Sequence, residues 1–323
     1  MFDIKYTYAV ARLRALETHL FSSAVLEQLM ACPNEESCLS LLEERGWGDP
    51  NEKQDADQML ARETEKIWET IESMHVDMSV FDVLRYPDEY QNLKAAIKET
   101  CREGHHPGIY IEGTAITGEQ MEKILREKEY FRLPEHMQAA AKEAYESLLH
   151  SRDGQLCDII VDRACLEAIL EAGRKSGEKL ISEYAEDTVA IADIKIAVRA
   201  QKTGKSAEFM KRAMAPCKKV SVDALAHAAT GGFNSICDYL STVGYGEGAE
   251  RLKESPSAFE RWCDDRIIQT IKPQKYEAAS VGPLVAYVLA RENEIKTVRI
   301  ILSGKASELP DAKIRERIRE MYV

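Results

Sequence analysis

YQNLKAAIKETCREG (90–104), IADIKIAVRAQKTGK (191–205) and IKTVRIILSGK (295–305) are three stretches of one chain that resemble one another. When they are aligned on a shared cation, Lys94 matches Lys195 and Arg299, at spacings of 101 and 104 residues. An apolar residue precedes each cation, and another follows three residues after it. Apolar positions four residues apart with a cation beside them form one buried helical stripe with a solvated edge. The alignment therefore predicts equivalent helices in an internally repeated chain.

The middle copy taken alone is ambiguous, because the apolar residues of IADIKIAVR alternate as they would in a β-strand. The first copy removes this ambiguity, since Leu93, Ala96 and Ile97 fit only a helical stripe. We therefore predict a helix for all three copies. The few glycines and prolines, 17 and 10 in 323 residues, also favour long helices over a chain of tight β-turns.

Other landmarks recur at a similar period. Phe21, Phe131 and Phe233 are spaced 110 and 102 residues apart, the GWG of 46–48 is echoed by the GYG of 244–246, and Met121, Leu225 and Ile314 take corresponding apolar positions. These landmarks predict three helical repeats, at 1–114, 115–217 and 218–323. The last segment resembles those that open the second and third repeats, so we expect this C-terminal helix to close on the first repeat. Ile314, Ile318 and Met321 predict that it runs close to the chain end.

Composition excludes several classes of function. The formal charge of −12 argues against non-specific nucleic-acid binding, which needs clustered Lys and Arg. The eight cysteines form no CxxC pair, which indicates reduced thiols in a cytosolic protein. No basic segment precedes an apolar run at the start, and no stretch offers 18 consecutive apolar residues. We therefore expect a protein that neither carries a signal peptide nor spans a membrane.

Two short motifs invite a nucleotide-binding hypothesis. TGKS (203–206) resembles the end of a phosphate-binding loop, but Arg199 stands where the first glycine should be, so helix termination at Gly204 explains it better. GYGEGA (244–249) matches a dinucleotide fingerprint formally, yet Pro256 leaves little room for the helix that should follow. We interpret both as structural turns and predict no cofactor.

The search for catalytic and metal-binding groups also ends without a candidate. Cys101, His105 and His106 are the densest group of possible ligands, but Gly104 and Pro107 break the helix there and no second cluster completes a set. Neighbouring carboxylates, at 43–44, 63–65 and 127–129, are interspersed with lysines and are expected on solvated helix faces. We predict no catalytic residue and no metal site.

Residues 282–323, GPLVAYVLARENEIKTVRIILSGKASELPDAKIRERIREMYV, closely resemble the C-terminal segment of the C subunit of bacterial and archaeal V/A-type ATPases. That protein is the counterpart of the d subunit in the eukaryotic vacuolar enzyme. YPDEYQNLKAAIK (86–98) is similar to the first-repeat helix of the same family. The resemblance rests most strongly on ARENEIKTVRIILSGK and on the ending IRERIREMYV.

The resemblance implies an all-α fold of three similar repeats around a pseudo-threefold axis, with a funnel-like shape. It implies a non-catalytic central-stalk subunit that joins the shaft of subunits D and F to the membrane rotor ring. Such a subunit transmits torque between ATP turnover and proton or sodium translocation, and lies at the cytoplasmic face of the membrane without entering it. Lys94, Lys195 and Arg299 are the repeat-equivalent structural or interface candidates.

Two alternatives of other classes stay open at this point. One is a helical scaffold of another complex, such as an α-solenoid, although solenoid repeats are shorter than this period and stack linearly. The other is an enzyme that binds a nucleotide through GYGEGA or TGKS. The sequence decides neither the transported ion nor the direction, synthesis or hydrolysis, in which the parent complex works.

Overall fold

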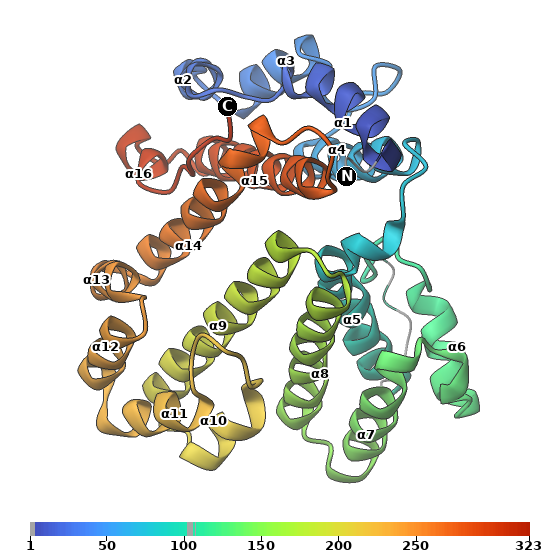
Figure 1. The fold of residues 1–323 in the computed structure, drawn as a ribbon, viewed down its shortest axis with the longest axis vertical. Helices are drawn as coiled ribbons and strands as arrows, with labels where there is room; N and C mark the ends of the chain where they lie inside the picture. The colour runs from blue at the N-terminus through green and yellow to red at the C-terminus, as the bar shows by residue number, and fades with distance from the viewer. Residues whose placement is uncertain (1–3, 102–105, 107) are drawn as a thin grey trace. The chain divides into compact units, whose positions relative to one another are not determined.

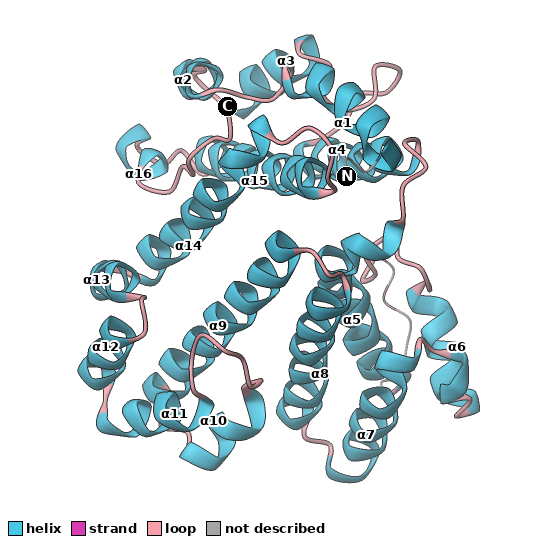
Figure 2. Ribbon diagram, in the orientation of Figure 1, coloured by secondary structure: helices cyan, strands magenta, loops and turns pink. Residues whose placement is uncertain are grey.

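The computed structural model describes residues 4–101, 106 and 108–323, and every regular element in these ranges is helical (Figure 1, Figure 2). The all-α fold class expected from the sequence is confirmed. The three aligned stretches lie in helices α5 (Asp82–Thr100), α9 (Lys179–Lys202) and α15 (Gly282–Ala306). The apolar alternation of the middle copy therefore lies on a helix, as the first copy predicts.

The chain forms two compact units, of which unit 1 combines Met1–Met78 with Glu247–Val323 and unit 2 is the continuous segment Ser79–Gly246. The helices of unit 1 are α1 (Ile4–Glu17), α2 (Ser23–Ala31), α3 (Glu35–Glu44), α4 (Ala56–Glu72), α13 (Gly246–Glu254), α14 (Pro256–Ile271), the 3₁₀ segment η3 (Lys272–Tyr276), α15 and α16 (Asp311–Arg315). Those of unit 2 are α5, α6 (Gly118–Glu127), η2 (Tyr130–Arg132), α7 (Glu135–Ser151), α8 (Gly154–Lys175), α9, α10 (Ala207–Ala213), α11 (Val222–Gly231) and α12 (Phe233–Thr242), and η1 (Met78–Phe81) begins at the boundary. The predicted division into three repeats stays a prediction, because compactness does not test repetition.

Local sequence signals set the helix ends. A capping box between Asp55 and Gln58 starts α4, and a second box between Thr117 and Gln120 starts α6. In each box the side chain of the first residue accepts a backbone N–H that the helix itself cannot pair. Helix α4 accordingly begins at Ala56 and α6 at Gly118, directly after the capping residues.

The core of unit 1 is built around α15, which packs against α4, α1, α3, α2, α14 and α16. Every residue from Gly282 to Arg291 is buried, so this half of the helix is enclosed on all sides. Helices from the first quarter of the chain thus surround a helix from its end (Figure 1). The family-like stretch Ala290–Lys305 lies in the second half of this central helix.

The core of unit 2 has α8 at its centre, packed against α5, α7, α9 and α10. Helix α5 also packs against α6, and α9 also packs against α11 and α12. Tyr90 of α5 illustrates the quality of this packing: it is 2% exposed, and its hydroxyl donates a 2.8 Å hydrogen bond to the carbonyl of His136 in α7. A buried phenol that keeps its hydrogen bond contributes apolar area without the cost of an unpaired hydroxyl.

The long C-terminal helix predicted from Ile314, Ile318 and Met321 is wrong, because α16 ends at Arg315. The backbone after α16 instead forms hydrogen bonds with side chains of α14 and α15. The Glu320 N–H donates to Asp265 of α14 at 2.6 Å, and the Glu320 carbonyl accepts from the Asn293 side chain of α15 at 2.8 Å. The chain end is therefore irregular and anchored within unit 1, with Met321, Tyr322 and the Arg319 side chain buried.

Candidate functional site

The three predicted cations lie at separate positions in the two units, and ion pairs are formed by Lys94 and Arg299. In unit 2, Lys94 of α5 pairs with Asp162 of α8 at 2.6 Å, while Lys195 is an exposed residue of α9. In unit 1, Arg299 of α15 pairs with Asp57 of α4 at 2.7 Å. Exposed ion pairs of this kind contribute at most about 1 kcal/mol. The described structure therefore assigns these cations to helix surfaces.

In each of the three aligned helices, a buried polar residue lies two positions before the cation. Asn92, Asp193 and Thr297 occupy these positions, and all three are 0% exposed. The Asn92 amide accepts from the Ile111 N–H and donates to the Ile111 carbonyl, both at 2.8 Å, so it holds the loop that follows α5. Asp193 holds the segment after α10 in a similar way, accepting from the Ala215 N–H at 3.1 Å. These buried polar positions could have been found from the sequence, because each copy has a polar residue at the same place in its apolar stripe.

Asp193 is only partly satisfied by this contact. Its Oδ1 atom accepts the Ala215 N–H, but its buried Oδ2 atom has no hydrogen-bond partner in the described structure. Burial raises the pKa of this carboxyl to about 7, although the Ala215 N–H and the charge of Arg163 act in the opposite direction. A buried carboxyl with one unpaired oxygen favours its protonated form. The Thr297 hydroxyl also lacks a partner there.

A buried cluster of charges and rings lies within unit 1. We call it the Arg291 cluster, and its members are Arg291, Glu294, Glu63, Trp47 and Phe21. The Arg291 guanidinium forms ion pairs with both Glu63 and Glu294, which are 3% and 2% exposed. It also lies 5.2 Å from the centre of the Trp47 ring, and that ring stacks on Phe21 at 5.0 Å. One cation from α15 thus links side chains of the first 63 residues.

Backbone groups complete the hydrogen bonding of the two carboxylates. The Phe21 N–H donates to Glu294 at 2.6 Å, and the Gly48 N–H donates to Glu63 at 2.8 Å. Burial lowers the pKa of the Arg291 guanidinium, but the charges of Glu294 and Glu63 raise it by more, so its pKa lies above the ordinary value. A charged network whose members are all paired makes the geometry specific, since removal of one member leaves the others unpaired.

The Arg291 cluster corrects the prediction for Glu63 and accounts for the GWG motif. Glu63 was expected on a solvated face, but it is buried because Arg291 and the turn at Gly48 provide partners in addition to Lys66 of its own helix, which pairs with it at 2.6 Å. The GWG turn holds Trp47 in the cluster, with its two glycines at φ of 82° and 78°. The three spaced phenylalanines do not share a role, since Phe21 is 3% exposed and Phe131 is 74% exposed.

The GYG echo is a structural turn, in agreement with the prediction. Gly244 has a φ of 86° and lies between α12 and α13, so a helix and not a strand precedes it. Tyr245 is 1% exposed and donates a 2.8 Å hydrogen bond to Asp187 of α9. A Cβ atom on Gly248 would lie 2.6 Å from the Trp262 ring, so close packing explains that glycine.

TGKS ends α9, as predicted. Gly204 has a φ of 64°, and the Lys205 N–H closes the helix on the Ala200 carbonyl at 2.9 Å. The Lys205 ammonium donates to the Gln155 side chain at 2.8 Å, and Ser206 caps α10. The backbone amides of this segment therefore terminate one helix and begin the next.

We expect Lys205→Ala to change the free energy of unfolding by no more than about 1 kcal/mol, because it removes only an exposed hydrogen bond and a contact with the Phe209 ring. Gly204→Ala is the matched comparison, and it should cost more because alanine is strained at positive φ. Urea unfolding followed by circular dichroism measures both. ATP binding that calorimetry detects in the wild type and that disappears in Lys205→Ala would contradict the helix-end interpretation.

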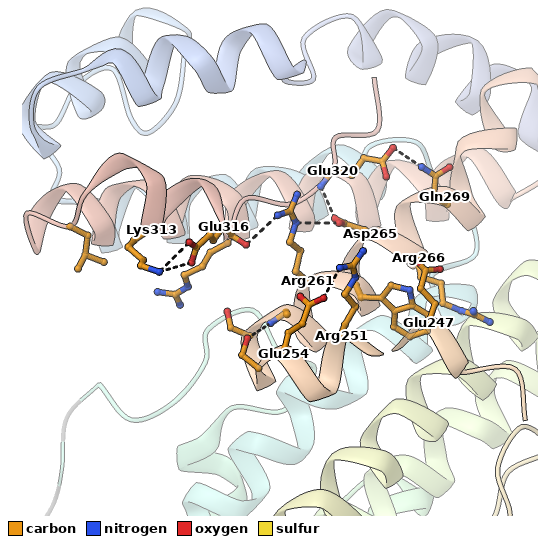
Figure 3. Close-up of a pocket in the computed structure, with 16 residues that line it drawn as sticks. Glu247, Arg251, Glu254, Arg261, Asp265, Arg266, Gln269, Lys313, Glu316 and Glu320 are labelled. Carbon is orange, nitrogen blue, oxygen red and sulfur yellow. Dashed lines mark hydrogen bonds and ion pairs between the residues drawn. The ribbon is translucent and has the colours of Figure 1, made fainter. Parts of the chain in front are cut away.

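A groove of about 1120 Å³ lies in unit 1 between α13, α14 and α16 (Figure 3). Arg261 points across it and donates to the Glu316 carbonyl at 3.2 Å, and Lys313 pairs with Glu316 at 3.1 Å. Arg251 and Glu254 pair with each other at 2.8 Å on the opposite wall. Small-molecule sites are mostly apolar with a few convergent polar groups. In this groove many of the lining side chains are charged, and several of them pair with one another.

The described ranges hold no group of three or more His, Cys, Asp or Glu residues arranged to bind a metal ion. Of the densest ligand candidates, Cys101 is exposed and His106 contacts Glu99 at 2.9 Å, while His105 lies outside the described residues. No helix in the part of the chain that the structure describes is long and apolar enough to cross a membrane.

Comparison with known families gives a match over nearly the whole chain, because residues 9–317 fit the family model named ATP synthase (C/AC39) subunit. The chain belongs to this family. Proteins of the C/AC39 family are non-catalytic members of the rotary complex. The resemblance read from residues 282–323 is therefore confirmed.

Individual relatives of the C/AC39 family agree with this assignment. The C subunit of the V-type sodium ATPase of Enterococcus hirae is 22% identical over 322 residues, which span 96% of this chain and 97% of that protein. The C subunit of the A-type ATP synthase of Methanocaldococcus jannaschii is 22% identical, over 96% of this chain and 85% of that protein. The corresponding A-type ATP synthase protein of a Desulfurococcus species is 30% identical over 46% of this chain and 41% of its own length.

Proposed function

We propose that this chain is the central-stalk subunit of a V/A-type rotary ATPase, where it joins the shaft of subunits D and F to the membrane rotor ring. In this role it transmits torque between ATP turnover and the translocation of protons or sodium ions. It acts at the cytoplasmic face of the membrane and is peripheral to it. The observation that carries the proposal is the match of the C/AC39 family model to residues 9–317.

The physical character of unit 1 supports a mechanical role. An element that transmits torque must resist deformation, and packed protein interiors are stiff because they contain few voids. Helix α15 is enclosed by helices from both ends of the chain, and Arg291 ties it to Glu63 of α4. The formal charge of −12 suits an oriented encounter with partner subunits, since charge complementarity guides docking more than it adds affinity.

We also propose that the chain comprises three similar helical repeats, with the boundaries given above, arranged around a pseudo-threefold axis in a funnel-like shape. Lys94, Lys195 and Arg299 are then equivalent surface positions on the last long helix of each repeat. The common burial of Asn92, Asp193 and the equivalent Thr297 supports this equivalence, because it places a polar side chain at one register of each helix.

Reconstitution tests the coupling role. The catalytic head and the membrane sector are combined in sealed vesicles with and without this chain, and ATP hydrolysis and ion uptake are followed in parallel. Without the chain, we expect hydrolysis to continue while ATP-driven ion uptake falls to background, because the mechanical link is absent and the catalytic residues belong to other subunits.

The Lys205→Ala protein is the matched control, and it should restore ion uptake as fully as the wild type does, since Lys205 only ends a helix. Ion uptake at the full rate without the chain would refute the coupling role. Loss of hydrolysis in the isolated head on omission of the chain would assign it a catalytic function instead. Recovery of an unrelated complex with the chain from cells would favour a general helical scaffold.

A further inference from the structure

Two of the eight cysteines lie at one corner of unit 1, where α2 gives way to α3. Cys32 directly follows the last residue of α2, and Cys38 lies one turn into α3. Between them, Asn34 caps α3 by accepting the Ser37 N–H at 2.9 Å, so the short connection is fixed in place. We call this corner the α2–α3 corner.

Both sulfur atoms are directed at the same turn of α2. The Cys32 thiol donates to the Gln28 carbonyl at 3.5 Å, and the Cys38 thiol donates to the next carbonyl, that of Leu29, at 3.4 Å. The Cys32 backbone N–H also donates to Leu29, at 3.2 Å. Successive carbonyls at the end of one helix are neighbours in space, so the two thiols are brought together by the fold.

The two thiols differ in access and in acidity. Cys32 is half-buried, whereas Cys38 is 0% exposed. Burial is the main cause that raises the pKa of the Cys38 thiol to about 12. The neighbouring Cys32 thiol raises this pKa further, through its charge and through a hydrogen bond. Two charged groups face it: Lys305 of α15 lowers its pKa, and Glu35 of α3 raises it. Lys305 is itself held there by the Met30 carbonyl at 2.8 Å.

We propose that Cys32 and Cys38 are a modification site at which a small-molecule disulfide oxidises the pair to an intramolecular disulfide. The Cys32 thiolate attacks one sulfur of the small disulfide, whose S–S bond breaks and releases one thiol. Cys38 then loses its proton and attacks the Cys32 sulfur, which forms the internal bond and releases the second thiol. Two protein thiols are oxidised and one small disulfide is reduced to two thiols.

The differing environments of the two thiols order these steps. Of these two thiols only that of Cys32 is accessible to the reagent, so it is modified first. Ring closure needs the Cys38 thiolate, which is scarce at neutral pH because its pKa is raised. Its fraction rises about tenfold per pH unit below the pKa, so closure should accelerate by about that factor between pH 7 and pH 8.

The purified full chain, treated with glutathione disulfide and then alkylated and digested with trypsin, provides the test. Cleavage after Arg14 and Arg45 yields a peptide that contains Cys32 and Cys38 and no other cysteine. We expect a peptide with a glutathione adduct first, and then a bridged peptide about 2 Da lighter than the dithiol, as two hydrogens are lost. The peptide 213–218 is an internal control, since Cys217 is half-buried like Cys32 but should form only the adduct.

Variants separate the two roles. Cys38→Ser should stop at the adduct on Cys32, and Cys32→Ser should leave Cys38 unmodified because it is buried. The wild-type peptide map needs no variant, so misfolding of either variant does not obscure the result. An adduct on Cys32 that never closes, even at pH 9, would overturn the proposal. So would an unmodified Cys32 in a sample whose Cys217 has reacted.

Discussion

Replacement of Arg291 by methionine is expected to lower the free energy of unfolding of unit 1 by about 3–5 kcal/mol. Methionine fills much of the space, but it leaves Glu294 buried without its cation and Glu63 with only the ion pair to Lys66. Backbone N–H groups from Phe21 and Gly48 remain, and they do not replace a full positive charge. The loss should be the largest of any single substitution on α15 that preserves side-chain volume.

Tryptophan fluorescence during urea unfolding measures this loss selectively, because all three tryptophans, Trp47, Trp68 and Trp262, belong to unit 1. Arg315→Met is the matched control: it removes the same charge from the pair with Glu27, where both side chains are exposed, and should have a much smaller effect. Adding Glu63→Gln and Glu294→Gln to the Arg291 variant should recover part of the stability. Equal losses in Arg291→Met and Arg315→Met would show that the cluster does not stabilise unit 1.

Asp193→Asn is expected to stabilise unit 2, by an amount that depends on pH. The pKa of Asp193 is raised to about 7 in the folded chain, from an ordinary value of 3.8. Between these values the unfolded chain releases a proton that the folded chain keeps, so wild-type stability falls as pH rises from about 4 to about 7. Asparagine cannot ionise. The gain should therefore be near zero below pH 4 and reach up to about 4 kcal/mol above pH 7.

Urea unfolding at pH 4 and pH 8, followed by far-ultraviolet circular dichroism, measures the gain for Asp193→Asn. The tryptophan signal should not change, since unit 2 contains no tryptophan. Asp162→Asn is the control, because it removes a carboxylate from the same unit at a position where the side chain is 54% exposed. A gain that is equal at both pH values would contradict the assignment of a protonated, buried Asp193.

The helices themselves could be predicted from short-range patterns. Apolar residues four apart and the capping residues act within one or two turns, so the sequence alone identifies α5, α9 and α15. The similarity of residues 282–323 to the C/AC39 family also needed no structure. These signals are local or are shared with relatives, and in these three helices tertiary contacts do not override them.

The Arg291 cluster could not be predicted, because its partners come from distant parts of the chain. Arg291 and Glu294 have the spacing of an ordinary surface pair, and Glu63 lies 228 residues away from Arg291. The ending IRERIREMYV has a helical pattern, yet its backbone bonds to α14 and α15 because their side chains offer better partners. In the aligned helices the prediction was placed on the cations, although the polar residues two positions before them, among them Asn92 and Asp193, are the buried ones.

The discontinuity of unit 1 has a consequence for how the chain is made. On the ribosome, α1 to α4 emerge before unit 2, but the helix around which they pack, α15, emerges only after unit 2. Unit 2 is continuous in sequence and can complete its core in the meantime. Until α15 has been synthesised, Glu63 of α4 lacks its ion pair with Arg291. The apolar faces of α1 to α4 also lack the helix against which they pack. Contacts that span most of the chain form slowly. We therefore expect nascent unit 1 to be more exposed to aggregation than nascent unit 2.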